Sequence, residues 1–153
     1  MKKYVIYPVA AHILLSFIGH MIYRCTWGGA EGGYIFMCFP EIDKGLIFFI
    51  SVFMELAIAC AYFYIGRKLP RLAKVTFLGV GSVVVLNLAC IAAFCLMGYD
   101  ISGALKLFGF FCGSSFFLIY IMGGASMWVS TVIIFIPAVL MLAGNCVRYR
   151  VHK

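Results

Sequence analysis

The sequence predicts an all-α fold, a polytopic bundle of helices that crosses a membrane. Of its 153 residues, 65% are hydrophobic and only 11% are charged, whereas a soluble domain is usually about a quarter charged. The apolar residues also come in runs of roughly 20, long enough to cross a hydrocarbon core about 30 Å thick at about 1.5 Å per residue. We therefore expect one integral membrane domain over residues 1–153.

Five apolar segments predict five transmembrane helices. They span residues 4–23, 45–66, 73–97, 105–122 and 127–147. The first follows a lysine pair, but it is too long for the apolar core of a signal peptide, so we expect a retained helix. Pro70 lies in the connector after the second segment and marks the break between the second and third helices.

The connectors predict the orientation of the chain. "GRKLPRLAK" (66–74) carries four positive charges and no negative one, so it should be cytoplasmic, together with the N-terminus. The connectors 24–44 and 98–104 then face outward. Five crossings, the expected number, place the basic tail "RYRVHK" outside, against this pattern. The alternative is four crossings plus a re-entrant segment within 105–147, which gives a cytoplasmic tail.

Two cysteines flank a glycine-rich stretch of the first outer connector. Cys25 and Cys38 lie on the side of the membrane where disulfides form, and we expect them to pair. Two free thiols remain the alternative, because separation and direction cannot be derived from sequence. The chain contains no Cys-x-x-Cys motif, which argues against a thiol oxidoreductase.

One acidic residue, Glu55, lies inside the predicted spans. It follows the start of its segment by ten residues, which places it roughly 15 Å into the membrane. His12 and Asn87 lie near the same depth in the first and third helices. An ionised carboxylate there costs on the order of several kcal/mol. We therefore expect Glu55 to be protonated, or paired with His12 as the ionisable partner near that depth.

Helical spacing places these polar residues on faces that turn into the bundle, because residues three and four apart share a face. His12 and Ser16 share a face of the first helix. The corresponding faces of the second and third helices consist of Ser51, Glu55, Ala59 and Tyr62, and of Gly79, Val83, Asn87 and Cys90.

Three further features shape the expected bundle. Gly109 and Gly113 are four residues apart, a spacing that lets two helix backbones approach closely. Pro137, in the middle of the last segment, is expected to break or hinge that helix. Tyr62 is also among the tyrosines expected at the cytoplasmic membrane interface, where aromatic rings are enriched.

These residues predict a small transport or ion-binding protein. A proton, a cation or a cationic solute would bind at Glu55, and the surrounding residues would be His12, Asn87, Ser51 and Ser16. Five helices leave little room for a water-lined cavity, so this function requires a homo-oligomer. The alternative is a non-catalytic membrane subunit, or an immunity or regulatory protein, that binds a larger partner in the bilayer. The polar residues would then only hold the helices in register.

Other functional classes are disfavoured. The net charge is +7, but the basic residues cluster just outside the apolar runs, where they meet lipid headgroups and not nucleic acid. The sequence has no His-Glu-x-x-His or Gly-x-Gly-x-x-Gly motif. His12 and His20 lie on one helix, so a single chain cannot ligate a haem iron with these two histidines from opposite faces. We expect no metal and no cofactor, and the sequence does not indicate an enzyme.

Overall fold

The computed structural model describes residues 2–26, 41, 43–70, 73–96, 132–133 and 135–151. Within these residues the regular elements are the helices α1 (Lys2–Thr26), α3 (Lys44–Lys68), α4 (Ala73–Leu96) and α8 (Ile136–Val151). The predicted all-α class is therefore confirmed for the described part of the chain. The helix predicted over 105–122, with Gly109 and Gly113, lies outside it.

The ends of α3 follow from local chemistry. Asp43 caps the N-terminus, and its side chain accepts a hydrogen bond from the Gly45 amide at 2.9 Å, as Asp commonly does at this position. At the other end, the Leu69 amide donates to the Gly66 carbonyl at 3.2 Å. Pro70 follows and cannot continue the helix. The predicted break at Pro70 is therefore confirmed.

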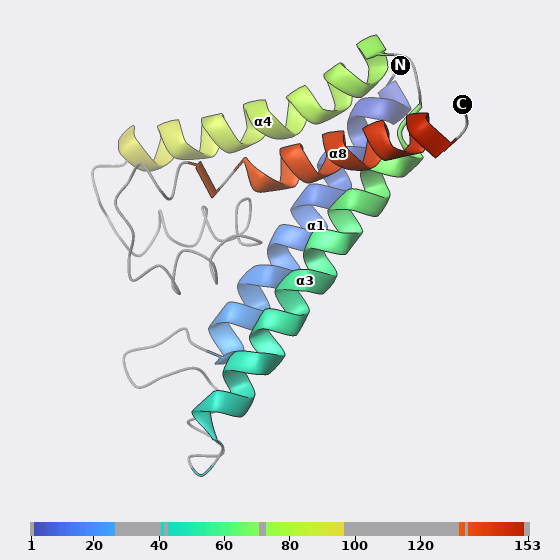
Figure 1. The fold of residues 1–153 in the computed structure, drawn as a ribbon. Coiled ribbons are helices and arrows are strands. Elements are labelled where there is room, and N and C mark those ends of the chain that lie inside the picture. The colour runs from blue at the N-terminus through green and yellow to red at the C-terminus, as the bar shows by residue number, and fades with distance from the viewer. Residues whose placement is uncertain are drawn as a thin grey trace.

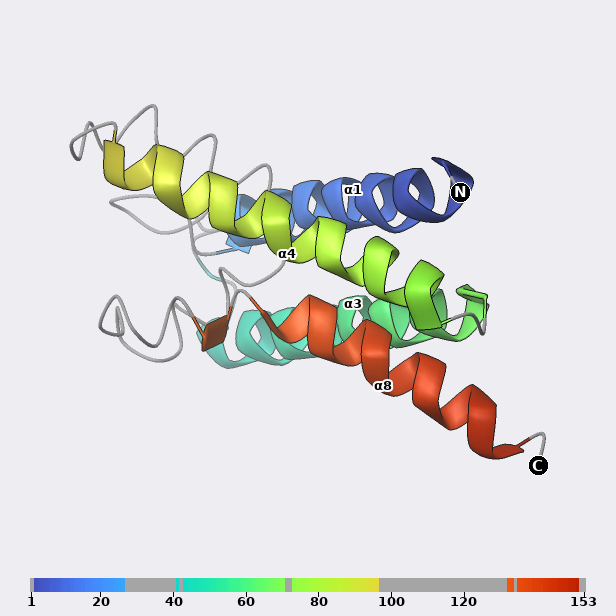
Figure 2. The same ribbon diagram turned by 90° about the horizontal axis from the view of Figure 1, so that it is seen from above.

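The four helices form two crossing pairs. α1 and α3 lie side by side and run in opposite directions (Figure 1), and α4 and α8 cross them near the end where both chain termini lie. The view from above in Figure 2 shows the same placement of the termini. α4 contacts α1, and α8 contacts α3. The core between the pairs consists of Ile58, Tyr62, Ile65, Leu69, Val80, Val83, Ala138 and Met141.

Pro137 lies at the start of the last described helix. α8 spans Ile136–Val151, so Pro137 is its second residue, and a turn at Phe135 separates α8 from the helical residues 132 and 133. The first amides of a helix have no partner within it, and proline is favoured at this end. Pro137 therefore lies at the start of α8, directly after the turn at Phe135, which agrees with the expected helix break at this proline.

Two of the described helices are long and apolar enough to cross a membrane, judged by length and composition. They are the segment Tyr4–Thr26 of α1 and the whole of α3. The apolar parts of the other two, Thr76–Ala92 and Ile136–Val147, are shorter. Large apolar side chains cover the outer faces: Phe49 and Phe53 of α3 are 72% and 71% exposed, and Phe77 of α4 is 76% exposed.

Candidate functional site

A buried polar cluster joins three helices. His12 of α1 lies between Tyr62 of α3 and Asn87 of α4: its Nδ1 is 2.8 Å from the Tyr62 hydroxyl and its Nε2 is 2.9 Å from the Asn87 Oδ1. The three side chains are at most 1% exposed. We call His12, Tyr62 and Asn87 the His12 cluster.

The hydrogen bonds define the proton positions on the His12 ring. The Asn87 Oδ1 can only accept, so Nε2 carries a hydrogen and donates. In a neutral imidazole the other nitrogen is then an acceptor, and the Tyr62 hydroxyl donates to Nδ1. The same hydroxyl lies 3.5 Å from the His12 backbone carbonyl, a second possible acceptor.

A close approach of α1 and α4 places Asn87 against His12. A Cβ atom at Gly79 would lie 2.7 Å from the Tyr4 carbonyl oxygen, so glycine permits this contact. Pro8 also packs against Gly79. Because proline has no amide hydrogen, it cannot donate a helical hydrogen bond to the Tyr4 carbonyl. His12 follows Tyr4 by eight residues, as Asn87 follows Gly79. Because α1 and α4 run in the same direction, this equal spacing places Asn87 opposite His12 just as it places Gly79 opposite Tyr4.

Glu55 lies apart from this cluster. It is partly buried and shares a face of α3 with Ser51 and Tyr62. Within the described part of the chain it forms no hydrogen bond or ion pair. The expected pair between Glu55 and His12 is therefore not formed. Both ring nitrogens of His12 are engaged by Tyr62 and Asn87, and Glu55 lies seven residues from Tyr62, roughly 10 Å along the helix.

The two serines predicted for the site are both buried, at 0% and 1% exposure for Ser16 and Ser51. The Ser51 hydroxyl donates to the Ile47 carbonyl of its own helix at 2.9 Å. Ser16 lies one turn beyond His12 on the same face, and its hydroxyl has no hydrogen-bond partner among the described residues. Of the predicted site residues, the structure thus brings His12 and Asn87 into contact and places Ser16 beside them.

Tyr62 belongs to the buried cluster, but the sequence-based prediction did not include it among the candidate site residues. It was assigned to the membrane interface, but its side chain is 1% exposed and lies in the core. Its ring centroid is 5.7 Å from that of His12. The ring of Tyr62 therefore packs inside the bundle and not on its outer face. The useful signal was its position on the same inward face as Ser51 and Glu55, which favours a buried role over an interfacial one.

The structure gives little information about the expected disulfide and about metal binding. Cys25 is a free, partly buried thiol, and Cys38 lies outside the described residues, so the disulfide stays a prediction. Among the residues that the structure describes, no three His, Cys, Asp or Glu side chains lie close enough together to hold a metal ion.

Comparison with known proteins identifies no relative. No family model matches the chain, no curated protein matches its sequence, and no solved structure matches its fold. The function has to be inferred from the geometry of the chain itself.

Proposed function

We propose that the chain is a multi-pass integral membrane protein that binds and releases a proton or a small cation within its helix bundle. The membrane location is supported by the two long apolar helices and by the phenylalanines exposed on the outer faces of α3 and α4. Such side chains are stable against lipid and costly against water.

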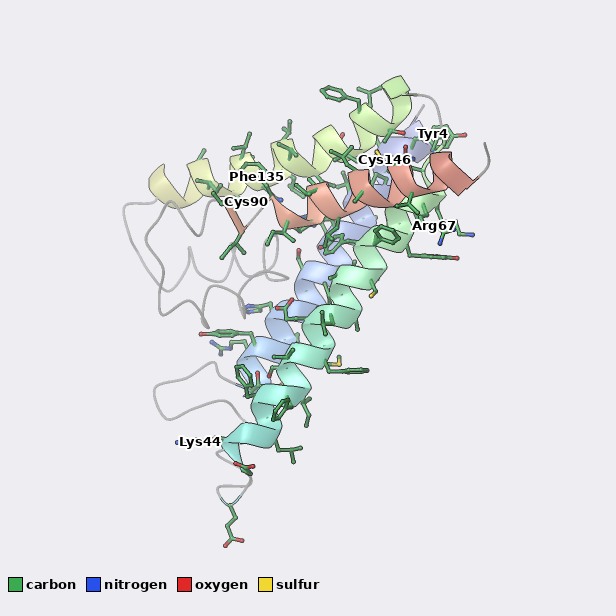
Figure 3. All side chains as sticks on the ribbon, viewed as in Figure 1. Tyr4, Lys44, Arg67, Cys90, Phe135 and Cys146 are labelled. Atoms are coloured by element: carbon green, nitrogen blue, oxygen red, sulfur yellow. The ribbon has the colours of Figure 1, made fainter. Side chains whose placement is uncertain are left out.

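The distribution of basic residues supports a cytoplasmic N-terminus. The last turn of α3 carries Arg67 and Lys68, and α1 begins at Lys2. Figure 3 shows Tyr4 and Arg67 at one end of the α1 and α3 pair and Lys44 at the other. By the positive-inside rule the end that carries Lys2 and Arg67 faces the cytoplasm.

The position of the C-terminus supports the four-crossing topology over the five-crossing one. Both termini lie at the same end of the helix pair (Figures 1 and 2), and an even number of crossings is the arrangement that would leave both on one side of the membrane. α8 carries Arg148 and Arg150 near its C-terminus, and these would then also face the cytoplasm. The proposed topology is four crossings with a re-entrant segment in the C-terminal half.

The observation that carries the ion-binding proposal is the His12 cluster. Three helices direct polar side chains, two of them ionisable, to a fully buried point between segments that are mostly apolar. Ionisable groups within membrane helices are expensive and usually mark ion or proton pathways. The Glu55 carboxylate on α3 has no partner among the described residues, so its oxygens are available to a proton or a cation.

Four helices of this length enclose little space for water, so the ion-binding function is proposed for a homo-oligomer in which a second copy completes the pathway. The membrane lipid is the other partner. The mass of the detergent-solubilised particle measures this directly: a multiple of the 17.0 kDa chain mass after correction for detergent supports the homo-oligomer.

A second candidate function is that of a non-catalytic membrane subunit, or an immunity or regulatory protein, that binds a different protein in the bilayer. It is favoured by the two hydrogen bonds that hold the His12 ring within the fold, because a cluster that only fixes helix register needs nothing more. A co-purified larger protein of different mass would support this function.

The ion-binding function is tested with Glu55→Gln, which keeps the shape and hydrogen-bonding capacity of the side chain but removes its titration. In liposomes we expect this variant to fold with unchanged thermal stability and to lose pH-dependent proton or cation flux. Glu55→Asp should retain a weaker flux. The matched control is Glu41→Gln, the same change at an exposed carboxylate, which should leave flux unchanged. Wild-type flux of Glu55→Gln at every pH would remove Glu55 from the ion pathway, and absence of flux from the wild-type protein would favour the subunit function.

A further inference from the structure

We propose that the bound ion is a proton and that His12, with Tyr62 as a reversible hydrogen-bond partner, is the residue that takes it. The inference rests on the proposed ion-binding function and names its substrate. It follows from the geometry of the His12 cluster, whose heavy atoms satisfy both the neutral and the cationic form of the imidazole.

The neutral form uses the contacts already described. The ring Nε2–H donates to the Asn87 Oδ1 over 2.9 Å, and the Tyr62 hydroxyl donates to Nδ1 over 2.8 Å. Each nitrogen has one partner of the required type, since a neutral imidazole has one donor and one acceptor.

The cationic form needs two acceptors for its two N–H groups, and the same atoms supply them. Asn87 Oδ1 still accepts from Nε2–H, and the Tyr62 oxygen accepts from Nδ1–H. The Tyr62 hydrogen then turns to the His12 backbone carbonyl, which lies 3.5 Å from the phenolic oxygen. A small closing movement completes this bond, so both ring N–H groups and the Tyr62 hydroxyl each have an acceptor.

Uptake of the proton is a relay through the Tyr62 hydroxyl. The Tyr62 O–H bond breaks as its proton passes to Nδ1 and forms the new N–H bond. The Tyr62 oxygen takes a replacement proton from a hydronium ion, which leaves as water. Release reverses these steps, so the ring gains or loses one proton and tyrosine returns each time to its neutral form.

A second polar side chain lies near His12 on α1. The buried Ser16 hydroxyl, one turn away on the same face, has no partner among the described residues and can hold a water on its way to the cluster. The other titratable or charged side chains described on these three helices are Tyr4, Tyr7, His20, Tyr23, Arg24 and Cys25 on α1, Lys44, Glu55, Cys60, Tyr62, Tyr64, Arg67 and Lys68 on α3, and Cys90 on α4. Of these, Tyr62 contacts the ring directly.

The test is nitrogen NMR of ¹⁵N-histidine-labelled protein in liposomes over a pH range. The chain has three histidines, so the His20→Gln/His152→Gln variant leaves His12 as the observed ring. We expect the Nε2–H neutral form at high pH and a doubly protonated ring at low pH. If that variant does not fold, the difference between wild-type and His12→Gln spectra isolates the same signals.

Tyr62→Phe provides the specific test of the tyrosine. It removes the acceptor of the charged ring, and bonds to charged groups are worth more than neutral ones. The midpoint should therefore fall by about one pH unit, equivalent to about 1.4 kcal/mol. Tyr64→Phe, the same change at an exposed position of α3, should leave it unchanged. Ser16→Ala should slow proton exchange at the ring and leave the midpoint in place.

Two results would overturn the inference. One is a ring that stays neutral throughout the pH range in which the protein remains folded, and the other is an Nδ1–H neutral form at high pH. Neither result affects the outcome of the Glu55 flux experiment, which tests binding of a cation separately. If His12 titrates but the liposomes show no flux, the proposed function fails, and with it any role of His12 in proton movement.

Discussion

The backbone of Gly66 in α3 lies directly against the backbone of Met141 in α8, where a Cβ atom at position 66 would overlap the Met141 carbonyl oxygen. Gly144 of α8 lies in the same way against the Phe63 carbonyl of α3. Small residues permit such close helix crossings. The crossing of α3 and α8 therefore depends on one glycine from each helix.

Replacing either glycine should destabilise the fold. Gly66→Ala or Gly144→Ala forces the two backbones apart, and overpacking of this kind typically costs about 1–3 kcal/mol. The measurement is thermal or denaturant unfolding in detergent micelles. Gly81→Ala is the matched control, because a Cβ at that position meets nothing within 4 Å. There the exchange should stabilise α4 by about 0.5–1 kcal/mol. Equal stability of all three variants would show that the α3–α8 crossing is not as close as described.

Asn145 of α8 forms two hydrogen bonds to the end of α3. Its Nδ2 donates to the Gly66 carbonyl at 3.3 Å and to the Leu69 carbonyl at 3.2 Å, two of the last carbonyls of that helix, which have few partners within it. Asn145→Ala should cost about 1–2 kcal/mol of unfolding free energy. Cys146→Ala, at the exposed neighbouring position, should change it little. A loss no larger than that of the control would mean that water replaces both hydrogen bonds.

The number of crossings can be determined by labelling from outside intact cells. In a cysteine-free background, Lys68→Cys is exposed at the end of α3 and should resist impermeant thiol reagents, because the positive-inside rule places that end in the cytoplasm. Lys153→Cys should resist them as well if the chain crosses four times. Labelling of Lys153→Cys alone would indicate five crossings. Labelling of Lys68→Cys would indicate that the orientation of the chain in the membrane is the opposite of the one proposed.

The disulfide between Cys25 and Cys38 is expected on chemical grounds, because the proposed topology places the end of α1, which carries Cys25, and the connector that follows it on the oxidising side. Mass spectrometry of alkylated, non-reduced protein should find the two residues joined in material purified under oxidising conditions. Cys60, exposed on α3, is the internal control for complete alkylation. Alkylated thiols at both positions 25 and 38 would rule the disulfide out.

Much of the local structure was predictable from the sequence. The runs of apolar residues predicted α1, α3 and α4 because such runs must satisfy their backbone hydrogen bonds internally. The break at Pro70 followed from the missing amide of proline. Helical spacing also predicted the inward faces, and His12, Ser16, Ser51 and Asn87 are all buried as expected. These features depend on residues close together in the chain.

The contacts between helices were decided only by the tertiary structure. Within one helix the rise per residue is constant, so the sequence determines face and approximate depth. It does not determine how far one helix slides along another, since that depends on which side chains pack at the crossing. The close approach at Gly79 fixes the offset between α4 and α1, and the one at Gly66 fixes the offset between α3 and α8. The packing of α1 against α3 places Tyr62, and not Glu55, within hydrogen-bond distance of His12.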